Sequence, residues 1–260
     1  MSKNKSPKQL LILFGLITLI LFGVINNVKS DKIQTNISNS EPQSSMNLDP
    51  YTYEPLHIDG NEELELLNYP GTGESWDDPY IIEDLSIISN TSHFAINLNN
   101  ITKYVLIQNC DLYLTTPYLY NSSYAIVINN SAHISIEYCN FRESSLSFSY
   151  AIKVINSEDI ILKNNFIDYF ARGIGIELSK NCTIKENEID YIVKDGIFVK
   201  NSENITVFNN KLEGRYKYGW YPEGTGVNSY HSTYIKIQNN QFSFLDRCVN
   251  LINDSKIAIS

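Results

Sequence analysis

The sequence contains few of the residues that bind transition metals. Its 260 residues include four histidines, four cysteines and two methionines. The histidines are scattered at positions 57, 93, 133 and 231, and no CxxC or HxxxH spacing occurs. Copper and zinc sites need clustered imidazole or sulfur ligands. The sequence therefore argues against a metal site, and no cofactor is expected.

Positive charge is also scarce. Lysine and arginine total 20 against 29 acidic residues, a formal net charge of −9. Residues 1–30 hold four of the lysines and no acidic residue, so residues 31–260 carry 16 basic and 29 acidic residues, a net charge of −13. A surface of this sign repels phosphate backbones, so nucleic acid is not an expected partner. Neutral glycans are not restricted in this way.

The one long hydrophobic run lies near the N-terminus, where three lysines precede an apolar stretch from Leu10 to Ile25. Such a run of about 16 residues is typical of a signal peptide, whereas a membrane span needs roughly 20. No Ala-x-Ala cleavage site follows. Residues 1–30 are interpreted as either a cleaved signal peptide or an uncleaved membrane-anchor helix through residues 10–25. In both cases the rest of the chain is expected outside the cytoplasm, secreted or anchored at the cell surface.

Residues 31–55 have no hydrophobic periodicity and are rich in Ser, Asn, Gln and Pro. Segments of this composition cannot bury enough apolar surface to fold. They are expected to form a flexible stalk that precedes a folded domain at residues 56–260.

An internal repeat dominates that domain. From Tyr104 onward a phrase recurs that consists of an aliphatic residue, two variable residues, a Cys or Asn, a variable residue and an apolar residue. Its fourth position is occupied in turn by Cys110, Cys139, Asn165, Asn187, Asn210 and Asn240, at spacings of 29, 26, 22, 23 and 30 residues. Short strands repeated at such spacings, without helical periodicity, predict a solenoid.

Each repeat also holds an earlier strand with alternating apolar residues, as in Ala125–Ile128 and Gly196–Val199, followed by a short polar corner. Two or three strands per turn predict a parallel β-helix whose coils lie about 4.8 Å apart. The Cys/Asn column then stacks at a corner, where asparagine amides hydrogen-bond along the stack. This column is expected to be a structural ladder.

The cysteines are expected to be small apolar residues. Cys110 and Cys139 would lie on adjacent coils, so a disulfide between them is the alternative. Cys182 and Cys248 are expected to be buried. The chain stops at Ile257–Ser260, where another repeat is due, so the C-terminal coil is expected to be incomplete. A truncated sequence, a missing cap and an end-on protein partner remain open as explanations.

Residues 56–83 and the repeats together resemble a known family. Ile58–Asn61 and the later Gly71–Glu83, which reads GTGESWDDPYIIE, are similar to the N-terminal segment of NosD-like right-handed β-helix proteins. The resemblance implies an all-β fold, a right-handed parallel β-helix solenoid, with a cap loop that leads into a first strand at Tyr80–Ile88. The family is associated with periplasmic copper delivery to nitrous oxide reductase and, more broadly, with carbohydrate-binding and sugar-hydrolase β-helices. It supplies no catalytic motif that this sequence matches residue by residue.

A polar column follows the last apolar column of the repeats. Stacking of coils would bring Asp168 and Asp190 about 5 Å apart and Asp168 and Glu213 about 10 Å apart. Inverting hydrolysis uses two carboxyl groups roughly 6.5–9.5 Å apart, and a lyase also needs a cation, for which Arg172 or Lys194 are candidates. A polysaccharide lyase or glycoside hydrolase is therefore one hypothesis. The alternative is that these residues form only the solvated face of an acidic β-helix.

Aromatic residues favour a different function. The segment 213–224 lengthens one coil, and its Gly and Pro content predicts a protruding loop, where binding residues tend to lie. Flat aromatic faces with polar tips suit stacking on sugar rings. The candidate ligand-binding residues are Tyr169, Tyr191, Tyr216, Tyr218, Trp220 and Tyr221. The alternative is that these side chains pack against the body of the solenoid.

Three functional hypotheses result. The preferred one is a non-catalytic extracytoplasmic β-helix that binds polysaccharide or envelope glycan. The second is the lyase or hydrolase, and the third is a structural or adhesive surface spacer. The sequence leaves open whether the protein is an enzyme.

Overall fold

The computed structural model describes residues 54–89, 93–115, 123–144, 149–217 and 221–260. All of them lie in one compact unit, Leu48–Ser260. The N-terminal segment at 1–30 and nearly all of the proposed stalk lie outside the described residues. Within the described ranges, no helix is long and apolar enough to cross a membrane.

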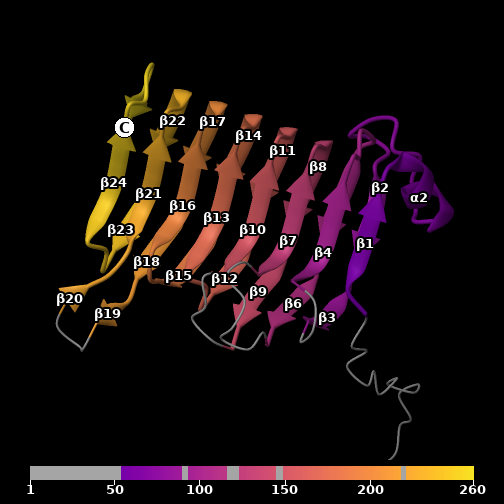
Figure 1. The fold of residues 1–260 in the computed structure, drawn as a ribbon, viewed down its shortest axis with the longest axis horizontal. Helices are drawn as coiled ribbons and strands as arrows, with labels where there is room; N and C mark the ends of the chain where they lie inside the picture. Colours follow the sequence, from indigo (N-terminus) through magenta and orange to yellow (C-terminus); the bar gives the residue numbers. More distant parts are fainter. Residues whose placement is uncertain (1–53, 90–92, 116–122, 145–148, 218–220) are drawn as a thin grey trace, which may run out of the picture. The chain divides into compact units, whose positions relative to one another are not determined.

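The described body is a solenoid of three parallel sheets, named A, B and C (Figure 1). The chain passes from a strand of sheet A to one of sheet B and then one of sheet C before it starts the next coil. Each strand pairs in parallel with its counterparts in the coils before and after it. The prediction of an all-β parallel β-helix is confirmed.

Sheet A consists of β1 (Leu56–Asp59), β4 (Phe94–Asn99), β7 (Tyr124–Asn129), β10 (Tyr150–Ile155), β13 (Arg172–Glu177), β16 (Asp195–Lys200), β21 (Thr225–Tyr230) and β24 (Arg247–Ile252). Sheet B consists of β2 (Tyr80–Glu83), β5 (Val105–Gln108), β8 (Ala132–Glu137), β11 (Glu158–Lys163), β14 (Lys180–Lys185), β17 (Glu203–Phe208), β22 (Thr233–Gln238) and β25 (Ala258–Ile259). Sheet C consists of β3 (Ser86–Ser89), β6 (Asp111–Leu114), β9 (Asn140–Glu143), β12 (Phe166–Asp168), β15 (Glu188–Ile192), β18 (Lys211–Gly214) and β23 (Gln241–Ser243).

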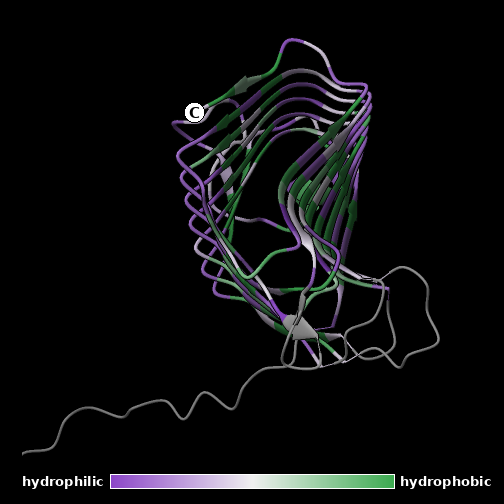
Figure 2. Cartoon of the chain, turned by 90° about the vertical axis from the view of Figure 1, so that its left-hand side faces the viewer, coloured by the Kyte–Doolittle hydropathy of each residue, from purple (hydrophilic) through white to green (hydrophobic). Residues whose placement is uncertain are grey.

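The core fills the space between the three sheets. Along each strand, successive side chains alternate between this interior and the outer face, and the inward ones are mostly apolar. Figure 2, viewed along the solenoid, shows hydrophilic segments gathered at the corners. Inward residues stack in columns; one runs through sheet B as Ile107, Ile136, Leu162, Ile184, Val207 and Ile237.

One inward column of sheet A is made of small residues. Its members are Ala95, Ala125, Ala151, Gly173, Gly196 and Gly226. A Cβ on Gly173 would lie 2.7 Å from Cγ2 of Ile189, and one on Gly226 would lie 2.5 Å from Cδ1 of Phe242. The small column therefore leaves room for the large inward residues of sheet C.

The expectation for residues 56–88 is wrong in its details. The first strand is β1 rather than Tyr80–Ile88, and the short helix α2 (Asn61–Leu66) follows it, with Leu64 buried. The predicted strand is divided into β2 and β3 because Asp84 takes a left-handed conformation at φ 56° and turns a corner. Strands β1, β2 and β3 thus already form one complete coil.

Cys248 is exposed, contrary to expectation, whereas Cys110, Cys139 and Cys182 are buried. Cys248 continues the small column of sheet A on β24, the last strand of that sheet. Among the described strands none pairs with the outer side of β24, so its inward side chain is less covered than those of earlier coils.

Candidate functional site

A hydrogen-bonded ladder holds the coils in register at the corner between sheets B and C. The backbone N–H of Asn165 donates to Oδ1 of Asn187 at 3.0 Å. The Asn187 amide in turn donates to Oδ1 of Asn210 at 2.9 Å and to the carbonyl of Leu162 at 2.9 Å. Asn240 receives the next bond, from the N–H of Asn210, at 2.9 Å. Each side chain thus satisfies buried backbone groups of the preceding coil.

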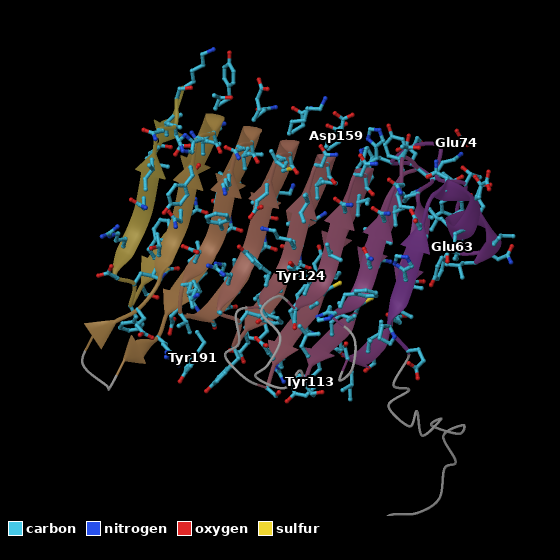
Figure 3. All side chains as sticks on the ribbon, viewed as in Figure 1. Glu63, Glu74, Tyr113, Tyr124, Asp159 and Tyr191 are labelled. Atoms are coloured by element: carbon cyan, nitrogen blue, oxygen red, sulfur yellow. The ribbon has the colours of Figure 1, made fainter. Side chains whose placement is uncertain are left out.

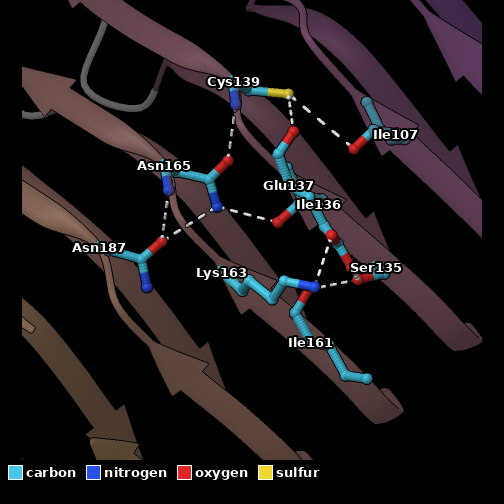
Figure 4. A network of polar contacts seen from close by, with 9 residues as sticks. All are labelled: Ile107, Ser135, Ile136, Glu137, Cys139, Ile161, Lys163, Asn165 and Asn187. Carbon is cyan, nitrogen blue, oxygen red and sulfur yellow. Dashed lines mark hydrogen bonds and ion pairs between the residues drawn. The ribbon is translucent and has the colours of Figure 1, made fainter. Parts of the chain in front are cut away.

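The two cysteines continue this ladder. In Figure 4 the backbone N–H of Cys139 donates to Oδ1 of Asn165, at 3.0 Å. The N–H of Cys110 faces Sγ of Cys139 at 3.5 Å. Both are free thiols, so the alternative of a disulfide between them is not realised.

A second ladder, which the sequence interpretation missed, lies at the corner between sheets A and B. Its buried members are Ser131, Ser157, Ser179, Ser202 and Ser232. The N–H of Ser157 donates to Oγ of Ser179 at 3.1 Å, and Oγ of Ser179 donates to the carbonyl of Glu177 at 2.7 Å. The serine spacings of 26, 22, 23 and 30 match the steps from Cys139 to Asn240. That coincidence was a signal available in the sequence.

The predicted carboxylates lie on the outer face of sheet C. Asp168 is in register with Arg142 on one side and Asp190 on the other. Burial raises the pKa of the Asp168 carboxyl, against the opposing effect of the Arg142 charge. Burial also raises the pKa of Asp190, opposed by Lys211 and reinforced by the neighbouring carboxylates.

Glu213 joins this face through an irregular register. Ile189 pairs with Leu212, but Ile192 pairs with Gly214, so Asp190 and Tyr191 together oppose the single residue Glu213. Lys211 lies among three carboxylates: its Nζ is 2.5 Å from Glu188 and 3.9 Å from both Asp190 and Glu213. Oδ1 of Asp190 is buried and has no hydrogen-bond partner in the described parts of the chain.

The two predicted cations lie elsewhere. Arg172 begins β13 of sheet A, where its Nε donates to Asp195 at 3.0 Å. Lys194 immediately precedes β16 of sheet A, and its pKa is lowered by burial. The structure therefore brings Asp168, Asp190 and Glu213 onto one face but places neither cation on it.

Two of the predicted aromatic residues meet beside these carboxylates. The rings of Tyr169 and Tyr191 stack with centroids 4.1 Å apart at 11°. Both residues have left-handed backbones, at φ 67° and 63°, and remain 41% and 37% exposed. The left-handed backbone turns each ring outward at a point where the strand would otherwise direct the side chain into the core.

The rest of the predicted aromatic set is only partly described. Tyr216 lies on β19 (Tyr216–Lys217) and Tyr221 on β20 (Tyr221–Pro222), which pair antiparallel and project beside β18 in Figure 1. Their side chains, and the whole of Tyr218 and Trp220, lie outside the described residues.

The outer face of sheet C is hollowed into a groove of about 750 Å³. Its lining comes from β3, β6, β9 and β12, and includes Ile88, Tyr113, Arg142 and Asp168, with Tyr169 just beyond β12. Tyr113, 37% exposed, was missed as a site residue. It occupies the same position after the apolar column as Asp168 does, so the repeat phrase held the signal.

The charged groups of this groove differ in how they are held. Asp111 accepts a hydrogen bond from Asn140 at 2.7 Å. Glu143 is only 4% exposed and accepts a hydrogen bond from the hydroxyl of Ser149. Arg142 is exposed and makes no hydrogen bond or ion pair with the other described residues. Its guanidinium is therefore available to a ligand.

Within the described ranges, no three His, Cys, Asp or Glu side chains lie close enough together to hold a metal ion. The groove offers hydrogen-bonding groups and aromatic faces instead. That combination suits a polar organic ligand with apolar patches.

Comparison with known proteins bears on the fold. Among solved structures, the chain is similar to a family 28 exopolygalacturonase of Yersinia enterocolitica (10% identity, TM-score 0.35), covering 67% of this chain and 45% of that one. It is also similar to the Dettilon tailspike protein (11% identity, TM-score 0.24), covering 69% and 59%. The chain thus spans less than two thirds of either protein. No curated protein matches it. The model of the family described as "Right handed beta helix region" matches residues 72–242, and the chain belongs to that right-handed β-helix family.

Proposed function

We propose that this domain binds polysaccharide or envelope glycan, without cleaving it, through the outer face of sheet C. The observation that carries the proposal is the groove, in which the rings of Tyr113 and Tyr169 accompany the polar groups of Arg142 and Asp168. Sugar rings present apolar C–H faces and a rim of hydroxyls. Aromatic faces stack on the first, and charged side chains hydrogen-bond to the second.

This function requires a location where the domain meets glycans. We propose that the chain is extracytoplasmic, exported or anchored through residues 10–25. Fractionation of cells that express the full chain would test this. The finer resemblance to NosD-like proteins is also a proposal, and it rests on the segment Gly71–Glu83.

The binding test compares a double variant, Tyr113→Ala with Tyr169→Ala, with the unmodified chain on a panel of immobilised polysaccharides. Loss of two stacking faces should weaken binding at least about tenfold. Tyr234→Ala is the matched control, since this exposed tyrosine lies on sheet B. Equal binding by the double variant and the control would refute the proposed site.

The alternative function is a lyase or hydrolase that uses Asp168 and Asp190. Its support is that burial raises the pKa of both carboxyls on one face, as general acids require. Release of new chain ends from a polysaccharide, abolished by Asp190→Asn, would establish this alternative. A protein that neither releases chain ends nor is retained on any polysaccharide would instead be a structural spacer.

A further inference from the structure

We propose that the ligand of this groove is an uncharged, linear glycan that lies along the solenoid axis across four adjacent coils. This inference rests on the proposed function and names its ligand class and binding direction. It is carried by the course of the groove over the strands, by two parallel rows of outer side chains, and by the sign of the charge around them.

The groove crosses strands instead of following one. Its lining comes from four consecutive strands of sheet C, and one row of outer residues runs in register through Ile88, Tyr113, Arg142 and Asp168. With about 4.8 Å between strands, this row extends roughly 14 Å along the solenoid axis. A single sugar would fill only part of that length, whereas an extended chain of several sugars would follow it.

A second row runs parallel to the first and has different chemistry. It passes through Ser86, Asp111 and Asn140, in register on β3, β6 and β9. Asn140 donates to Asp111 between two of these strands, at 2.7 Å. The first row thus supplies apolar and aromatic surface at Ile88 and Tyr113 and charged groups at Arg142 and Asp168. The second row supplies only hydroxyl, carboxylate and amide groups. A sugar chain lying along the groove could place ring faces on Ile88 and Tyr113 and its hydroxyls on the polar groups of both rows.

The charge around the groove disfavours an acidic polymer. Arg142 is the only cationic residue in the lining, against Asp111, Glu143 and Asp168. Since Glu143 is buried, the groups that can face a ligand are one basic residue against two acidic ones. A uronate polymer would bring a carboxylate with every sugar to a groove whose exposed groups already include more acidic than basic residues. Arg142 is therefore expected to donate hydrogen bonds to sugar hydroxyls rather than to pair with a sugar carboxylate.

The aromatic surface continues beyond the groove. Tyr169 stacks on Tyr191 of β15, the next strand of sheet C. In Figure 3 the labelled side chains of Tyr113 and Tyr191 project from the same edge of the solenoid. A longer glycan can therefore reach Tyr191 after it has filled the groove.

The experiment measures calorimetric binding of the full chain to cello-, xylo- and manno-oligosaccharides of increasing length, beside oligogalacturonates of the same lengths. For at least one neutral series, affinity should rise with each sugar up to about four or five units, set by the coil spacing, and then level off. Tyr191→Ala should weaken only the longest members, by about three- to tenfold. Tyr234→Ala should leave the whole series unchanged.

Two results would overturn this inference while the proposed function stands. One is tighter binding of oligogalacturonates than of every neutral series, with the difference abolished by Arg142→Gln. The other is neutral affinity that no longer increases beyond two sugars, which indicates recognition of a chain end. If neither series nor any immobilised polysaccharide is bound by a chain whose circular dichroism shows intact β structure, the proposed function fails as well.

Discussion

At the scale of single residues, the buried asparagines of the B–C corner each serve two coils. Asn187 accepts from the N–H of Asn165 and donates to the carbonyl of Leu162 and the side chain of Asn210. An apolar replacement would leave these partners buried and unsatisfied. Buried unsatisfied groups cost more than an average hydrogen bond contributes.

Asn187→Ala is therefore expected to lower the free energy of unfolding by roughly 2–4 kcal/mol. Urea denaturation followed by circular dichroism measures the change. The control is Asn140→Ala, because this exposed side chain makes one bond, to Asp111 at 2.7 Å; its effect should stay below about 1 kcal/mol. Similar losses in both variants would contradict the role assigned to the buried ladder.

Much of this residue-level pattern can be predicted from the sequence. The column from Cys110 to Asn240 follows from spacing, because each coil places the same position at the same corner. The serine ladder has equally regular spacing, but serine is so common in this chain that its periodicity is less conspicuous. The burial of Cys248 could not be judged correctly, since it depends on which strands lie beyond β24 and not on the residue itself.

At the scale of elements, sheets A and C fit together through a small-to-large match. An ideal Cβ on Gly173 would lie 2.5 Å from the carbonyl oxygen of Gly196 and 2.7 Å from Cγ2 of Ile189. The first contact is with backbone and cannot be relieved by a side-chain rotation. The glycine is thus required by the close approach of β13 to its neighbours.

Gly173→Ala should destabilise the domain by about 1–3 kcal/mol through overpacking, read from the midpoint of urea unfolding. Ala151→Gly, one coil earlier in the same column, tests the opposite change. It should cost only about 0.5–1 kcal/mol, mainly through backbone entropy. A Gly173→Ala variant as stable as the unmodified chain would show that the coils can separate to accept a methyl group.

The bulge in β15 gives sheet C its other distinctive property. By setting Asp190 against Glu213 beside Lys211, it leaves the Asp190 carboxyl with a raised pKa, chiefly through burial. A carboxyl whose pKa is higher in the folded state than in the unfolded state binds more protons when folded. Its contribution to stability is fully present below the unfolded pKa and is lost as pH rises through the folded pKa.

Asp190→Asn removes this ionisation, so the variant should have a higher melting temperature than the unmodified chain at pH 7. The difference should shrink on acidification and vanish below the ordinary carboxyl pKa of 3.8. Asp77→Asn, at an exposed position in the cap loop, serves as the control and should show no such convergence. A lower melting temperature for Asp190→Asn at pH 7 would show that the ionised Asp190 carboxylate stabilises the fold, contrary to this prediction.

At the scale of the whole domain, a solenoid grows by adding coils that contact only their neighbours. The groove on sheet C is a product of this growth, since four strands separated by more than twenty residues each come to line one surface. In glycan binding along the axis, each successive coil would add one more outer side chain to the row that contacts the sugar chain. The net negative charge of the domain favours an uncharged glycan over an acidic one, a preference that no single coil provides.

The sequence by itself determined the parallel β-helix, the ladder at the B–C corner and the stacking of Asp168 on Asp190, because each follows from strand alternation and repeat spacing. Only the tertiary structure decided which outer residues share a face. Arg172 and Lys194 follow the carboxylates closely in the chain, yet they lie with sheet A, because the chain turns a corner at Tyr169–Ala171 and again after Ile192. Tyr113 is distant in sequence but lies in the same groove as Tyr169. Corners redirect side chains by large angles over two or three residues. At these two corners the left-handed residues are Tyr169 and Tyr191, a residue type that does not mark a corner in the sequence as asparagine does.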